Sequence, residues 1–256
     1  MPDDIKEAIR RGLADRGTPL EFRAARALAE AGFTVRQGRA YLARDGAEPK
    51  VREIDVLAEL PERFSVLVYA VVECKKTAAP WVVLEAPGPP VSREVVDGLI
   101  VTSSAAEQLR RAYSGPQSVL PRLLAQTPDR TAFQVVDPTS RKDAPYQALS
   151  QVVSACLGTL DERPQTRGLA WPVVVISGPL FAATYGLDPD SGDEPEIVER
   201  RRERLLWHGG PAGRPVLVDI VTIDALADHA ERLLQGLVDI AYVIGAEEGP
   251  ERPQLR

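Results

Sequence analysis

The segment SVLVYAVVECK (65–75) constrains the fold more than any other part of the chain. A valine-rich apolar run of this length is typical of a strand that is buried on both faces of a sheet. Three further segments are predicted strands, 51–60, 172–178 and 215–223, and they alternate with segments of helical periodicity. The sequence therefore predicts an α/β fold with a mixed central sheet flanked by helices.

The clearest predicted helix is 18–31. Thr18 can cap it, Pro19 suits its first position, and Gly32 is a good stop. The other helices are predicted at 3–14, 94–112, 144–160 and 224–238. Short strands are predicted at 33–37, 80–84 and 133–136.

Composition indicates an ordinary globular protein, with 44% hydrophobic and 27% charged residues. No apolar run approaches the roughly 20 residues that cross a bilayer, and the N-terminus is charged, so we expect a cytoplasmic protein that does not associate with a membrane. We treat 1–256 as a single domain, with a core at about 17–180 and a strand-helix extension at about 181–256.

The few cysteines and histidines exclude two kinds of site. Cys74 and Cys156 are far apart in a predicted strand and a predicted helix, which argues against a disulfide framework or a zinc knuckle. His208 and His229 have no cysteine neighbours, so they make a poor transition-metal site.

Glu73 and Lys75 end the long apolar strand, where charges are expensive without a purpose. Side chains two apart share a face, whereas Cys74 points into the other layer. If the hairpin turns near 62–63, opposed residues sum to about 126. Asp55 then faces Val71 and lies diagonal to Glu73, within roughly 7–8 Å.

The choice of lysine at this strand end is also informative. Of 31 basic residues only five are lysine, and Lys75 and Lys76 are two of them. Lysine can lose its proton when desolvated, and arginine cannot. Two carboxylates beside a lysine suit magnesium-assisted phosphodiester hydrolysis, because magnesium binds through one or two carboxylates plus water. The alternative is a solvated strand end with a Glu73–Lys75 ion pair.

Three stretches carry a resemblance to a known family. GTPLEFRAARALAEAGFTV (17–35), REIDVLA (52–58) and YAVVECKKTAAPWVVL (69–84) resemble the PD-(D/E)xK nuclease superfamily, closest to Mrr-like restriction endonuclease domains. The chain departs from the pattern in two places. It has Glu-Ile-Asp in place of Pro-Asp, and a glutamate where Mrr-like domains usually carry glutamine.

The resemblance implies a restriction-endonuclease-like αβββαβ core and a catalytic set of Glu21, Asp55, Glu73 and Lys75. Asp55, Glu73 and the carbonyl of Cys74 would hold Mg²⁺, with Mn²⁺ able to substitute. Lys75 would position the attacking water, and Glu21 would support the metal or its waters. Glu21 could instead close a capping box with Thr18.

We therefore expect a Mg²⁺-dependent deoxyribonuclease, an endonuclease whose partner is DNA in preference to RNA, in restriction or phage defence. A homodimer or a protein partner stays open. One rival is a non-catalytic module that binds nucleic acid or protein on the same fold. The other is a structural or regulatory subunit.

Weaker signals stay open at this stage. Glu53 reads as a solvent-side or auxiliary carboxylate, and Trp81 either packs or stacks on a base. The run ERRRER (199–204) reads as a solvated helix face, with phosphate binding as the alternative. Gln147 and Gln151 could face the site from helix 144–160. The acidic loop 186–196 reads as a solvated loop.

Overall fold

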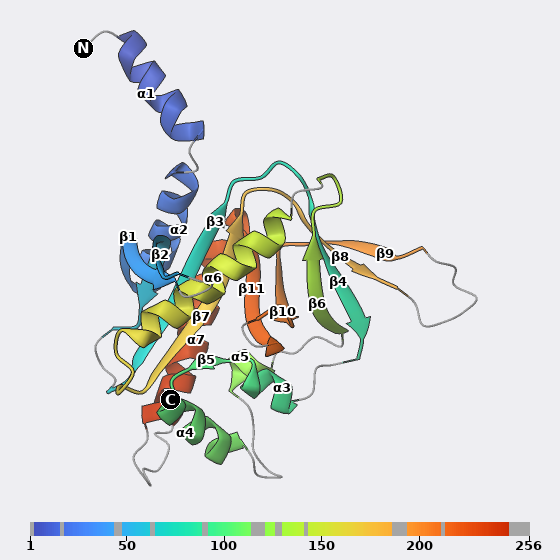
Figure 1. The fold of residues 1–256 in the computed structure, drawn as a ribbon. Helices are drawn as coiled ribbons and strands as arrows, with labels where there is room; N and C mark the ends of the chain where they lie inside the picture. The colour runs from blue at the N-terminus through green and yellow to red at the C-terminus, as the bar shows by residue number, and fades with distance from the viewer. Residues whose placement is uncertain are drawn as a thin grey trace.

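The computed structural model describes residues 3–15, 18–43, 48–61, 65–88, 92–113, 121–125, 130–140, 143–185, 194–210 and 213–245. Within these ranges the chain is an α/β protein built on one mixed sheet of eleven strands, with helices on both faces (Figure 1). Among the described helices, none is long and apolar enough to cross a membrane.

The helices are α1 (Asp3–Asp15), α2 (Thr18–Ala31), α3 (Ser92–Asp97), α4 (Ser103–Tyr113), α5 (Arg122–Ala125), α6 (Ala144–Asp161), the 3-10 turn η3 (Ile223–Ala225) and α7 (Leu226–Gly245). The strands are β1 (Thr34–Ala43), β2 (Lys50–Glu59), β3 (Leu67–Lys75), β4 (Trp81–Pro87), β5 (Ile100–Val101), β6 (Arg130–Val136), β7 (Gly168–Ile176), β8 (Leu180–Thr184), β9 (Glu196–Arg200), β10 (Arg202–Trp207) and β11 (Val216–Thr222). The sheet runs β1-β2-β3-β7-β11-β10-β6-β4-β8-β9, and β5 pairs with β7.

Two apolar cores lie on the two faces of this sheet, as expected for strands buried on both sides. Val72 of β3 packs in the core that α2 and α7 cover, whereas its neighbour Val71 packs in the core that α6 covers. Figure 1 shows α6 crossing the front of the sheet. The prediction of a doubly buried strand at 65–75 is confirmed.

The predicted bounds of one helix hold, and two other predicted helices are wrong. Helix α2 has the predicted bounds, and Gly32 adopts a φ of 108°, the left-handed conformation that ends a helix. The single helix predicted at 94–112 is wrong, because Ile100 and Val101 leave the helical path to pair with β7. The helix face predicted at 199–204 is also wrong, because these residues end β9, which pairs with β8, and begin β10, which pairs with β11.

The C-terminal third of the chain does more than extend the core. Strand β11 pairs in parallel with β7, and β10 then pairs with β11, so both lie inside the sheet. The seven residues of β11 include the buried run Val216–Val221, which an edge strand facing water would not sustain.

Candidate active site

The candidate residues lie at one edge of the sheet, where three parallel strands end together. Lys75 closes β3 beside Ile176 of β7, and Ile176 lies beside Thr222 of β11. In open α/β sheets, ligands bind outside the carboxyl ends of the strands. This edge is therefore the first place to look for chemistry.

Strands β2 and β3 set the carboxylates against each other. Val56 faces Val72 and Leu57 faces Val71, so the predicted opposition of Asp55 and Val71 is wrong by two residues. The hairpin closes with the N–H of Leu60 donating to Val68, which moves the turn later than predicted. Because the shift is even, every side chain keeps its face, and the same register continued by one pair brings Asp55 opposite Glu73.

The side chain of Asp55 replaces a backbone carbonyl as hydrogen-bond acceptor at the end of the β2–β3 ladder. Its Oδ2 accepts a hydrogen bond from the backbone N–H of Cys74 at 2.7 Å, beyond the last strand pair at Val56 and Val72. The N–H and C=O of one strand residue point to the same side, so the carbonyl of Cys74 is also directed toward Asp55. The two strands separate here, and a carboxylate fills the opening.

Lys75 connects the sheet to helix α6. Its Nζ lies 2.6 Å from Oε1 of Glu73 and donates to Oε1 of Gln151 at 2.8 Å. Gln151 and Lys75 are both partly buried, so the amine is held between two fixed acceptors. Gln151 is thus the residue of α6 that reaches the site, whereas Gln147, one turn away, is exposed.

Glu21 reaches the same group from helix α2. The pKa of Glu21 is raised by burial, then by the nearby charges of Asp55 and Glu53. The negative charge of Glu21 in turn raises the pKa of Glu73. Glu21 is therefore near enough to the two carboxylates for their charges to act on one another. Glu53 is exposed and acts on the site as a neighbouring charge.

Burial and mutual repulsion raise the pKa values of the carboxylates at this site. Burial, followed by the charge of Asp55, raises the pKa of Glu73 to about 7, although Lys75 opposes the shift. Burial likewise raises the pKa of Asp55, and the hydrogen bond from Cys74 opposes it. An additional cation would relieve this repulsion.

The donor set fits magnesium better than a metal that needs a closed protein cage. Among the described residues, no cluster of three or more histidine, cysteine, aspartate or glutamate side chains has the spacing of metal ligands. The observed hydrogen bonds use Oδ2 of Asp55 and Oε1 of Glu73, so Oδ1 and Oε2 face no hydrogen-bond donor within the described part of the chain. Two carboxylates plus water and substrate oxygens are the usual set for magnesium.

The other aromatic and polar candidates are structural. Trp81 is buried in the α6-side core, so it packs and does not offer a face to a base.

A buried ionic cluster that the sequence did not indicate lies between the sheet and α7. Asp219 accepts from Trp171 at 2.9 Å and from Arg204 at 2.7 Å, and Nε2 of His229 lies 3.4 Å away without hydrogen-bond geometry.

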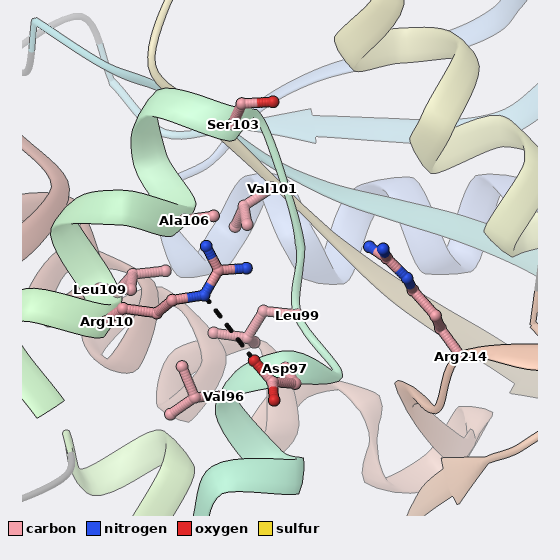
Figure 2. Close-up of a pocket in the computed structure, with 9 residues that line it drawn as sticks. All are labelled: Val96, Asp97, Leu99, Val101, Ser103, Ala106, Leu109, Arg110 and Arg214. Carbon is pink, nitrogen blue, oxygen red and sulfur yellow. Dashed lines mark ion pairs between the residues drawn. The ribbon is translucent and has the colours of Figure 1, made fainter. Parts of the chain in front are cut away.

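A small pocket of about 200 Å³ lies near the amino end of β7, away from the carboxyl ends that carry the candidate residues. Figure 2 shows Arg110 and Arg214 on opposite sides of it, with Arg110 paired to Asp97. It is next to β5, which pairs with the first residues of β7 and not with the end that carries the candidate site. None of the candidate residues lines it.

Searches with protein-family models, against curated proteins and against solved structures find no match to this chain.

Proposed function

We propose that this protein is a metal-dependent nuclease with a restriction-endonuclease-like core. The observation that carries the proposal is the meeting of Asp55, Glu73 and Lys75 at the carboxyl ends of the parallel strands. Segments α2, β1–β3, α6 and β7 follow the αβββαβ order of such a core.

Each residue of the group has a defined task in this proposal. Asp55 and Glu73, with the carbonyl of Cys74, would hold Mg²⁺ or Mn²⁺ through oxygen atoms. When bound there, the metal would polarise a phosphate oxygen and make its bound water more acidic. Glu21 would accept hydrogen bonds from water at the site, since its charge and those of the two carboxylates act on one another.

Lys75 would orient the attacking water and offset negative charge on the phosphate. Its amine already sits between Glu73 and Gln151, so its position is set before substrate arrives. Preorganised charge of this kind contributes more than charge that must be reoriented during the reaction. Gln151 is a positioning residue in this scheme.

Incubation with plasmid and linear DNA in Mg²⁺ or Mn²⁺ tests the proposal. Wild type should cleave, and Lys75→Ala and Asp55→Ala should lose cleavage by about 10²-fold or more. Lys6→Ala, which removes an exposed lysine of α1, is the matched control and should retain cleavage. Retardation of DNA without metal or cleavage would instead support a binding module.

A further inference from the structure

A group of arginines lies at the same sheet edge as the candidate site, on the far side of β7 and β11. Arg201 and Arg202 are at the β9–β10 junction, and Arg232 is on α7. All are exposed, and none has a carboxylate partner among the described residues. The proposed catalytic mechanism does not use them.

Strand pairing fixes where this group lies relative to Lys75. Lys75 pairs with Ile176, and Ile176 pairs with Thr222. Thr222 then donates to the carbonyl of Arg201 from its N–H at 2.9 Å and from its Oγ1 at 3.1 Å. Three strand spacings of about 4.8 Å separate β3 from β10, which puts Arg201 about 14 Å from Lys75.

The positive charge of Arg202 forms no ion pair within the described residues. Burial and then the charge of Arg232 lower the pKa of Arg202, so the charge of Arg232 acts on Arg202. The carboxylates that act on Arg202 are Asp219 and Glu203. Arg204 pairs with Asp219 at 2.7 Å, and Arg200 pairs with Glu203 at 3.5 Å, so both carboxylates are already engaged.

Several exposed guanidinium groups suit an extended anion more than a small enclosed one. Guanidinium binds phosphate oxygens through planar, paired hydrogen bonds. Hydrogen bonds to the nucleic-acid backbone come largely from such side chains, and they set the register of the substrate. Lys75 lies on the α6 side of the sheet and Arg202 lies on the α7 side, so these arginines would hold a nucleic-acid strand on the α7 side of the carboxyl ends of the strands.

We propose that Arg201, Arg202 and Arg232 bind phosphates of a nucleic acid on the α7 side of the carboxyl ends of the strands. That this nucleic acid is the substrate of the candidate site rests on the proposed function; binding by these arginines does not. Because Arg202 and Arg232 repel each other, one phosphate between them would be favoured over an empty site.

Fluorescence anisotropy with a labelled DNA duplex in EDTA, over a series of salt concentrations, tests this without cleavage. Changing Arg201, Arg202 and Arg232 together to Ala should weaken binding. It should also reduce the salt slope by about 0.9 for each phosphate that the variant no longer neutralises. The same three positions changed to Lys should keep most of the slope, because lysine retains the charge.

Arg163→Ala is the matched control, since Arg163 is exposed and precedes β7 at the opposite edge. It should leave the slope unchanged, and unfolding temperatures should show that all variants are folded. The proposal is overturned if the triple Ala variant keeps the wild-type slope, if Arg163→Ala reduces it equally, or if wild type does not bind.

The two proposals can fail separately. If the arginine variants lose binding while Lys75→Ala still cleaves, the phosphate site stands and the nuclease assignment falls. If Lys75→Ala abolishes cleavage while the triple Ala variant binds and cleaves like wild type, the nuclease assignment stands and the phosphate site falls.

Discussion

Oδ2 of Asp55 lies 2.7 Å from the backbone nitrogen of Cys74, so a side chain of β2 accepts the hydrogen bond that a backbone carbonyl accepts elsewhere in the ladder. This bond links β2 to β3 beyond the last backbone pair of their ladder. It also directs the carbonyl of Cys74 into the same opening as the carboxylate. A site with several oxygen ligands can form there.

Gln151 should matter through Lys75. Gln151→Ala removes the acceptor at 2.8 Å from Nζ, so the amine is left with one fixed partner in place of two. We expect DNA cleavage to fall by about 10–100-fold, as when groups that orient a ligand or catalytic side chain are removed. Gln151→Glu should restore part of the rate, because it retains an acceptor, and should shift the pH profile of kcat by adding a charge.

The control for Gln151 is Gln147, one turn earlier on α6 and exposed. Gln147→Ala should cleave at the wild-type rate. Equal decreases in the two variants would mean that the helix as a whole, rather than the hydrogen bond to Lys75, had been disturbed.

The pH dependence of stability should reveal the raised pKa of Glu73. Its pKa in the folded protein is about 7, above the ordinary 4.5, so its contribution is fully present below pH 4.5 and is lost as the pH rises through 7. In EDTA, Glu73→Gln should therefore raise the unfolding temperature relative to wild type more at pH 8 than at pH 5.

Glu203 provides a matched comparison, because burial followed by the charge of Glu85 also raises its pKa to about 7. Glu203→Gln should show the same pH trend, but without any effect on the response to Mn²⁺. A stability difference for Glu73→Gln that stays constant between pH 5 and pH 8 would contradict the raised pKa.

Stability should be sensitive to a change at Asp219. It is 2% exposed and accepts hydrogen bonds from Arg204 and Trp171. Asp219→Ala would leave the guanidinium of Arg204 buried without its partner, at a cost of about 3–5 kcal/mol. Urea denaturation measures this cost, and a change below about 1 kcal/mol would show that water or another group replaces the carboxylate.

The sequence predicted the parts of the fold that have strong periodic patterns and end signals. The bounds of α2 follow from Thr18, Pro19 and Gly32, and β3 follows from its apolar run. Because Glu73 and Lys75 are two residues apart in one strand, they share a face of the sheet whatever the register of the hairpin. Gln151 was only one of two candidates on α6, because the rotation of a helix over a sheet depends on packing.

Non-local pairing explains what sequence reasoning did not reach. The run 199–204 has a charge at every position, so neither helix nor strand periodicity is visible in it. Its strand conformation comes from the pairing of β9 with β8 and of β10 with β11, where Arg204 faces Asp219. Ile100 and Val101 interrupt the predicted helix 94–112 for a similar reason, since β7 offers them a partner.

Calorimetric titration of Mn²⁺ into the full chain tests the central claim most directly, because it needs no knowledge of the substrate. Wild type should bind Mn²⁺ with release of heat, Asp55→Asn should weaken binding by about tenfold or more, and Asp224→Asn, at an exposed aspartate paired with Arg23, should bind like wild type. Identical isotherms for wild type and Asp55→Asn, or no binding by wild type, would contradict a metal site at Asp55 and Glu73.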